Sequence, residues 1–238
     1  MTKKYVKIII VIIILLIAGY FSYKGYNFYN YYLSAQKFDD VNSNFEITDT
    51  MTISNDKTID YITFDEVKMV NDFKNFDKVN TQGDFIVSYQ QSNENGNNNT
   101  FSYAKGDEKV SNLINFSSAT DKKINKINAE EIFKKYDIKN DLDLIKYLST
   151  WDFKKMNIFT RTFELKKNYF FNYIKNTEYP GVEKILLLEG KYQGYILYYD
   201  DFKEINILKN NKNYMFLFSG EKFTNEYIKY FLDTLVID

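Results

Sequence analysis

Adjacent acidic residues are the side chains of this sequence whose spacing could support chemistry. Two carboxyl groups about 5–10 Å apart can cleave a glycosidic bond, one as the acid and the other as the base or nucleophile. Five pairs are candidates: Asp39–Asp40, Asp65–Glu66, Glu130–Glu131, Asp141 with Asp143, and Asp200–Asp201. Acids are also common in the first turn of a helix and in hairpin turns, for purely structural reasons. The structural explanation is favoured for each pair, and no catalytic residue is predicted.

The chain contains no cysteine and no histidine. The missing cysteine excludes disulfides, thiol nucleophiles and thiolate metal sites. The missing histidine removes the commonest general base and the usual metal ligand. Loops for nucleotides or calcium and the serine-hydrolase motifs are absent as well. The sequence therefore predicts neither a cofactor nor a metal site, and any catalysis would depend on Asp, Glu, Lys, Ser or Tyr.

Arg161 is the one arginine in a chain that otherwise uses lysine for positive charge. Its planar guanidinium could bind the carboxylate of a ligand through two hydrogen bonds. An intramolecular ion pair with an acid such as Glu164 is the favoured alternative, because helix surfaces commonly supply such pairs. The net charge of −1 leaves no basic face for phosphates, so no nucleic-acid partner is predicted.

The N-terminal segment is apolar enough to cross a membrane. Between Tyr5 and Tyr23 the only charged residue is Lys7, and these 19 residues approach the roughly 20 that span a bilayer core. A cleaved signal peptide is less favoured, because no small-x-small cleavage site follows. A buried helix of a soluble fold would normally be amphipathic. The sequence thus predicts a signal-anchor helix that contacts the lipid bilayer through Ile8–Tyr23.

The distribution of lysines predicts the orientation of this helix. Lys3, Lys4 and Lys7 precede it, whereas only Lys24 follows closely. The positive-inside rule then places the N-terminus in the cytoplasm and the rest outside. Residues 1–35 are accordingly expected to form a cytoplasmic tip, a single-pass helix of the cell membrane and a helical stalk reaching about Ser34. Residues 36–238 are expected to form one extracytoplasmic domain.

The tyrosines of the stalk recur at helical spacing. Tyr26, Tyr29 and Tyr32 would lie on one side of a continuing helix. They are interpreted as an interfacial aromatic anchor rather than as a face that pairs with another helix, since tyrosine is enriched at membrane interfaces.

Alternating and helical patterns predict an α+β domain with a mainly antiparallel sheet packed against several helices. Residues 39–60 are expected to be mostly loop or short strand, and residues 62–70 a strand with an irregularity. Residues 84–91 and 100–104 are expected to pair as antiparallel strands. Capping residues predict helices that begin after Asn128 and Asn140, and a third helix is expected from Thr160 or Thr162 to about Asn176.

The last sixty residues carry the clearest pattern. Four strands are expected at 182–188, 192–199, 204–208 and 214–218, and their short links predict an antiparallel meander. Several of these strands are apolar on both faces, so other elements must cover both sides of the sheet. A final helix should run from Asn225 to about Val236 behind the capping Thr224. Its apolar stripe comprises Tyr227, Ile228, Phe231, Leu232 and Leu235.

These features favour a membrane-anchored extracytoplasmic domain that binds an envelope protein or peptide and has no enzymatic activity. One alternative is a hydrolase that acts on an envelope polymer through carboxylates. A second is a structural subunit of a membrane assembly or an immunity-type protein, in which the aromatic stalk would pair with other helices.

Overall fold

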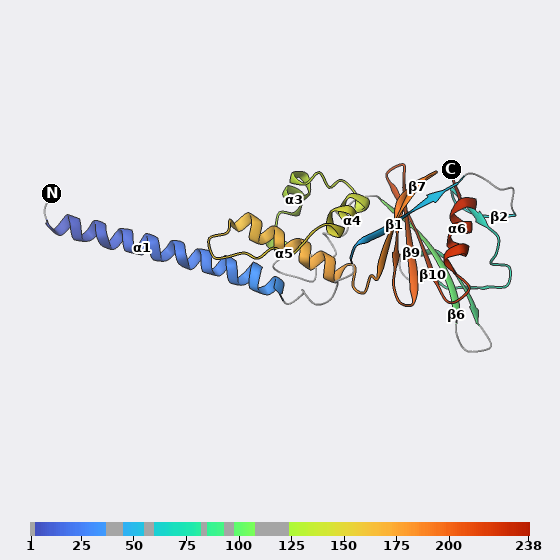
Figure 1. Cartoon of the computed structure of the whole chain (residues 1–238), viewed down its shortest axis with the longest axis horizontal. Coiled ribbons are helices and arrows are strands. Elements are labelled where there is room, and N and C mark those ends of the chain that lie inside the picture. Colours follow the sequence, from blue (N-terminus) through green and yellow to red (C-terminus); the bar gives the residue numbers. More distant parts are fainter. Residues whose placement is uncertain (1–2, 37–44, 55–59, 82–84, 93–97, 108–123) are drawn as a thin grey trace. The chain divides into compact units, whose positions relative to one another are not determined.

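The computed structural model of the protein describes residues 3–36, 45–54, 60–81, 85–92, 98–107 and 124–238 (Figure 1). The chain divides into two compact units. The first comprises Met1–Ser43, Ser111–Asp137 and Trp151–Pro180. The second comprises Asn44–Val110, Ile138–Thr150 and Gly181–Asp238. Both α and β elements are present, which confirms the α+β class.

The first unit begins with the long apolar helix α1 (Lys3–Asn27), which runs directly into a π-helical stretch, η1 (Phe28–Leu33). Helical structure thus reaches the expected end near Ser34. Within the described residues, one helix is long and apolar enough to cross a membrane, and its most apolar part is not buried by the rest of the protein.

Three further helical segments complete the described part of the first unit: η3 (Ile124–Lys126), α3 (Ala129–Lys135) and α5 (Thr162–Thr177). The predicted cap of α3 is confirmed, because the side chain of Asn128 accepts a hydrogen bond from the backbone of Glu131. Aromatic rings join the helices, with the centroids of Phe133 and Phe170 5.5 Å apart. The stalk packs on α5 as well, where Asn172 Nδ2 donates to the carbonyl of Ala35 at 2.7 Å.

The second unit is built on an eight-stranded mixed sheet. Its order is β1-β7-β8-β9-β10-β6-β5-β4. The predicted C-terminal meander forms its centre, as β7 (Lys184–Gly190), β8 (Gln193–Tyr198), β9 (Phe202–Lys209) and β10 (Lys212–Ser219). The remaining strands are β1 (Ile47–Ile53), β4 (Asp77–Val79), β5 (Phe85–Ser92) and β6 (Asn98–Asp107). Strands β5 and β6 pair antiparallel as expected, whereas β1 runs parallel to β7.

A small second sheet, with the order β11-β3-β2, corrects one prediction. The segment expected to be a single irregular strand forms two, β2 (Tyr61–Phe64) and β3 (Val67–Val70), which pair as a hairpin. Asp65 in the turn has φ of 53°, a left-handed conformation that Asp tolerates better than most residues. The third strand, β11 (Val236–Ile237), pairs with β3 and follows the last helix.

The main core of the second unit lies on one face of the large sheet. Helix α6 (Asn225–Thr234) covers it, and Thr224 caps this helix by accepting from the backbone of Tyr227. Residues of α6, of the small sheet and of the meander belong to one apolar cluster. A second helix, α4 (Asp141–Ser149), lies beside β7 and β8, where Leu142 and Leu187 line a common small cavity. The expected covering of the apolar strands by other elements is thereby observed on the α6 face.

Candidate functional site

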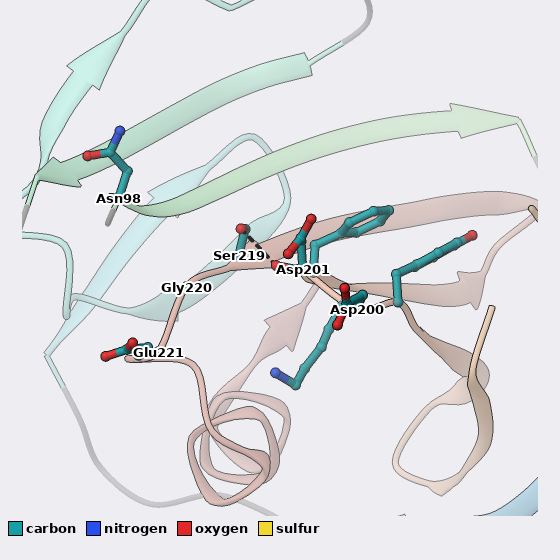
Figure 2. Close-up of a pocket in the computed structure, with 9 residues that line it drawn as sticks. Asn98, Asp200, Asp201, Ser219, Gly220 and Glu221 are labelled. Carbon is teal, nitrogen blue, oxygen red and sulfur yellow. Dashed lines mark hydrogen bonds between the residues drawn. The ribbon is translucent and has the colours of Figure 1, made fainter. Parts of the chain in front are cut away.

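The candidate site is a pocket of about 620 Å³ at one end of the large sheet of the second unit (Figure 2). Three segments form it: the turn between β8 and β9 with the first two residues of β9, the last residue of β10 with the two residues that follow it, and the first residue of β6. The lining residues are Asn98, Tyr199, Asp200, Asp201, Phe202, Lys203, Ser219, Gly220 and Glu221. It contains the predicted pair Asp200–Asp201, at the hairpin turn where the sequence places it.

Local hydrogen bonds and stacking fix the turn that carries these acids. The backbone N–H of Tyr199 donates to the carbonyl of Phe202 at 2.9 Å, which closes the hairpin. The rings of the same two residues stack with their centroids 4.2 Å apart. Ser219 Oγ donates to the carbonyl of Asp201 at 2.9 Å, so the turn is also held to the end of β10. The two carboxylates therefore project from a braced turn.

Gly220 allows the start of β6 to approach the chain after β10. Its φ is +107°, and a Cβ there would lie 2.4 Å from Asn99 Oδ1 and 2.8 Å from the carbonyl oxygen of Asn98. No other residue type accepts both the conformation and the close approach. The backbone N–H of Lys222 donates to the same Asn99 Oδ1 at 3.1 Å. Glycine at this position thus shapes the wall of the pocket that Asn98 provides.

The charges around the pocket are mainly acidic. Asp200, Asp201 and Glu221 contribute three carboxylates, and Lys203 is the one basic residue of the lining. Lys203 Nζ donates to the carbonyl of Phe223 at 2.9 Å, and burial lowers the pKa of this amine. Figure 2 shows Glu221 on the side of the pocket away from Asp200. Such separated hydrogen-bond acceptors suit a ligand that is cationic or donates hydrogen bonds. Among the described residues, no cluster of three acids could hold a metal ion.

The pair Asp65–Glu66 has a structural partner. Lys105 on β6 lies 2.8 Å from a carboxylate oxygen of each of these acids. The hydroxyl of Tyr214 on β10 donates to the other oxygen of Glu66. The hydrogen bonds from Lys105 and then Tyr214 lower the pKa of Glu66, while burial and this carboxylate raise the pKa of Tyr214 to about 12. The pair therefore holds the turn of the small sheet on the large one.

The shifted pKa of Glu66 predicts a pH dependence of stability. A folded-state pKa below the unfolded value of about 4.3 contributes stability above that pH, and this contribution is lost as pH falls through the folded pKa. We expect Glu66→Gln to lower the melting temperature at pH 7. In acid, the melting temperatures of the variant and the wild type should converge. Thermal unfolding measured between pH 3 and about pH 8 by circular dichroism tests this expectation.

Glu204→Gln is the matched control with the opposite sign. Burial raises the pKa of Glu204, so the wild type loses stability as pH rises through that pKa. The Gln variant escapes this loss, and its melting temperature should rise relative to the wild type with increasing pH. If the melting temperatures of Glu66→Gln and Glu204→Gln, each relative to the wild type, changed with pH in the same direction, the opposite pKa shifts assigned to these two acids would be contradicted.

The remaining acidic pairs that the structure describes lie in the first turns of helices, where negative charge is favourable. Glu130 and Glu131 lie in the first turn of α3, and Asp141 and Asp143 in the first turn of α4. Asn140 caps α4 by accepting from the backbone of Asp143 at 2.9 Å, as predicted. The pair Asp39–Asp40 lies outside the described residues.

The expected ion pair between Arg161 and Glu164 is not formed. Glu164 instead pairs with Lys167 at 2.6 Å and with Lys135 at 3.4 Å. Lys167 is better placed because it lies one turn along α5 and is mostly buried, whereas Arg161 is the exposed N-cap residue of that helix. Within the described part of the chain, no ion pair reaches Arg161.

Sequence reasoning missed Glu204. Its carboxylate accepts from Asn206 Nδ2 at 2.7 Å, and Asn206 Oδ1 accepts from Asn213 Nδ2 at 2.9 Å. Asn206 is buried, with 1% of its surface exposed. The alternation of Glu204, Ile205 and Asn206 indicates that one face of β9 is polar. Because both faces of the sheet are expected to be covered, this polar face was the sequence signal for a buried acid at Glu204.

The arrangement as a whole is suited to non-covalent binding. The pocket offers carboxylates on a braced turn, whereas among the described candidate pairs Asp65–Glu66 is bound by Lys105 and the other two lie in the first turns of α3 and α4. Comparison of the chain with protein-family models, with curated proteins and with solved structures finds no match.

Proposed function

We propose that this protein is a single-pass membrane protein that displays a non-enzymatic binding domain outside the cell. In this proposal α1 is an uncleaved signal anchor of the cell membrane with its N-terminus in the cytoplasm, and residues 36–238 are extracytoplasmic. The observation that carries it is the exposure of α1: each residue from Ile8 to Ile17 leaves 41–69% of its surface uncovered.

An exposed aliphatic surface of this size favours lipid over water. Burying one such side chain is worth about 1.5–3 kcal/mol, so ten exposed in succession would be very costly in water. A core helix would be covered by the rest of the fold, and this one is not. The lysines that precede the apolar stretch of α1 outnumber the single Lys24 that closely follows this stretch, which supports the proposed cytoplasmic N-terminus.

The packing of the stalk argues for an anchor rather than a cleaved signal peptide. The helix continues without interruption from α1 into η1, and the ring of Tyr31 lies against that of Tyr169 on α5, with centroids 5.9 Å apart. The end of the apolar helix is therefore integrated into the fold of the first unit. Cleavage near Ala18 would leave this helix without its apolar half.

The acidic pocket supports a binding role, with an envelope protein or peptide as the proposed partner. Its three carboxylates can accept hydrogen bonds from a lysine or arginine side chain of that partner. The hydrolase alternative needs two acids in a shared catalytic environment, whereas the Asp65–Glu66 pair is bound by Lys105.

Single-cysteine labelling tests the topology, because the native chain has no cysteine to compete. A membrane-impermeant maleimide should label Lys229→Cys, an exposed position on α6, in intact cells. It should label Thr2→Cys only after the membrane is permeabilised. The reversed pattern would overturn the orientation, and release of the full-length protein by alkaline carbonate would overturn the anchor.

In material extracted from membranes, Asp200→Asn with Asp201→Asn should lose a partner that the wild type retains.

A further inference from the structure

An exposed aromatic side chain lies beside the end of the apolar helix. Phe159, in the loop that leads into α5, leaves 62% of its surface exposed. Its ring centroid is 6.1 Å from that of Phe21, and the neighbouring Ile158 approaches α1 at Gly25. All of these residues belong to the first unit. The loop therefore adds apolar surface next to the segment that is proposed to cross the membrane.

Hydrogen bonds place this loop at the level of the first charge after the apolar stretch. Lys24 Nζ donates to the carbonyl of Phe159 at 3.4 Å and to that of Thr160 at 3.2 Å. Phe21 precedes Lys24 by three residues, about 4.5 Å along the helix axis and toward the bilayer. The backbone of Phe159 thus lies level with Lys24, while its ring lies near Phe21. That depth corresponds to the interfacial layer, where aromatic side chains are enriched.

The charges of the loop complement lipid headgroups. The segment from Trp151 to Arg161 contains three basic residues, Lys154, Lys155 and Arg161, and one acid, Asp152. All four are exposed. Arg161 has no ion pair in the described structure, and its guanidinium can form two hydrogen bonds to one phosphate. Lysine, which supplies every other positive side chain of this sequence, cannot form this two-point contact.

A single exposed phenylalanine is unremarkable on a soluble protein. What distinguishes Phe159 is its position: it lies against the end of the apolar stretch of α1, and two residues later comes Arg161, which forms no ion pair with any residue that the structure describes. Lys24 of α1 donates to two carbonyls of the loop, so the loop cannot move away from this end of the apolar stretch without breaking those hydrogen bonds.

We infer that the loop Asn157–Arg161 is a second membrane contact. Phe159 inserts into the interfacial layer of the bilayer, and Arg161 with Lys154 and Lys155 binds the phosphates of lipid headgroups. The inference rests on the proposed membrane anchoring of α1. Its consequence is that the first unit is held to the bilayer at two points, which restricts rotation of α5 about the axis of the anchor.

Depth measurements on the full chain in phosphatidylglycerol-containing nanodiscs test this contact. Single cysteines at Phe159→Cys, Leu16→Cys and Thr177→Cys would each carry an environment-sensitive fluorophore. Thr177 is the matched aqueous control, since it ends α5 about 22 Å from its first residue. We expect nitroxide-labelled lipid to quench the fluorophore at 159 several-fold more than that at 177, and aqueous iodide to show the reverse order.

The three positions separate the possible outcomes. If the label at 159 behaves like that at 177 while the label at 16 stays in lipid, the loop contact is overturned and the anchor stands. If iodide reaches the label at 16, the proposed membrane anchoring itself fails. Protection of the label at 159 from both quenchers would indicate a protein surface, such as a second copy, and would also overturn the inference.

Discussion

A chain that ends at Ser219 is expected to lose the cooperative unfolding transition of the second unit. This truncation removes α6, whose residues Ile228, Phe231 and Leu232, together with the following Leu235, are completely buried. Burial of each side chain is worth about 1.5–3 kcal/mol, so the four together contribute roughly 6–12 kcal/mol. The whole stability of a domain is about 5–15 kcal/mol. The loss should therefore exceed what the remaining sheet can tolerate, as measured by calorimetry of the detergent-solubilised protein.

A chain that ends at Leu235 is the matched control. It keeps α6 and loses β11, including the backbone N–H of Ile237 that donates to the hydroxyl of Tyr192 at 2.9 Å. We expect this shorter truncation to melt cooperatively at a lower temperature than the full chain. A soluble product ending at Ser219 that still melts cooperatively would contradict the assigned role of α6.

Elements specified by neighbouring residues were predictable from the sequence. Asn128, Asn140 and Thr224 each cap the helix that follows, because a capping side chain bonds to the backbone only a few residues away. The meander of β7 to β10 followed from its short links, which leave antiparallel pairing as the available arrangement. In both cases the deciding interaction is local in the chain.

Elements specified by distant residues were not predictable to the same degree. Strand β1 pairs in parallel with β7, so Thr50 lies opposite Leu187. Its sequence is largely polar and shows no feature that names a partner so far along the chain. Strand β11 is two residues long, which is too short for a periodic pattern, and it exists because β3 offers a free edge. Parallel and edge pairings depend on the assembled fold rather than on local propensity.

The same distinction applies to the candidate site. The position of Asp200 and Asp201 in a turn followed from the sequence, but the pocket around them did not. Its walls need Gly220 to bring Asn98 within reach of the chain after β10, and these residues are far apart in sequence. The partners of Glu164 likewise depend on burial, which selects Lys167 over Arg161.

Phe101→Ala is expected to destabilise the second unit more than any other single substitution proposed above. Phe101 is completely buried on β6, and its ring centroid lies 4.4 Å from that of Phe73 and 5.0 Å from that of Phe218. Replacing a buried phenylalanine by alanine removes its transfer energy and leaves a cavity, at a cost of about 3–5 kcal/mol. Urea unfolding of the full chain in detergent, followed by circular dichroism, measures this loss.

Ile86→Ala provides the control on the neighbouring strand β5. Ile86 leaves 43% of its surface exposed, so its replacement should cost at most about 1 kcal/mol, mainly through strand propensity. The ring of Phe101, on β6, packs against Phe218 of β10 and Phe73 in the segment before β4. Its centroid also lies 6.2 Å from that of Phe231 on α6. Because its ring is shared among these elements, its removal should lower the midpoint of the same transition that truncation of α6 abolishes. Equal losses for Phe101→Ala and Ile86→Ala would mean that the core is not organised around this ring.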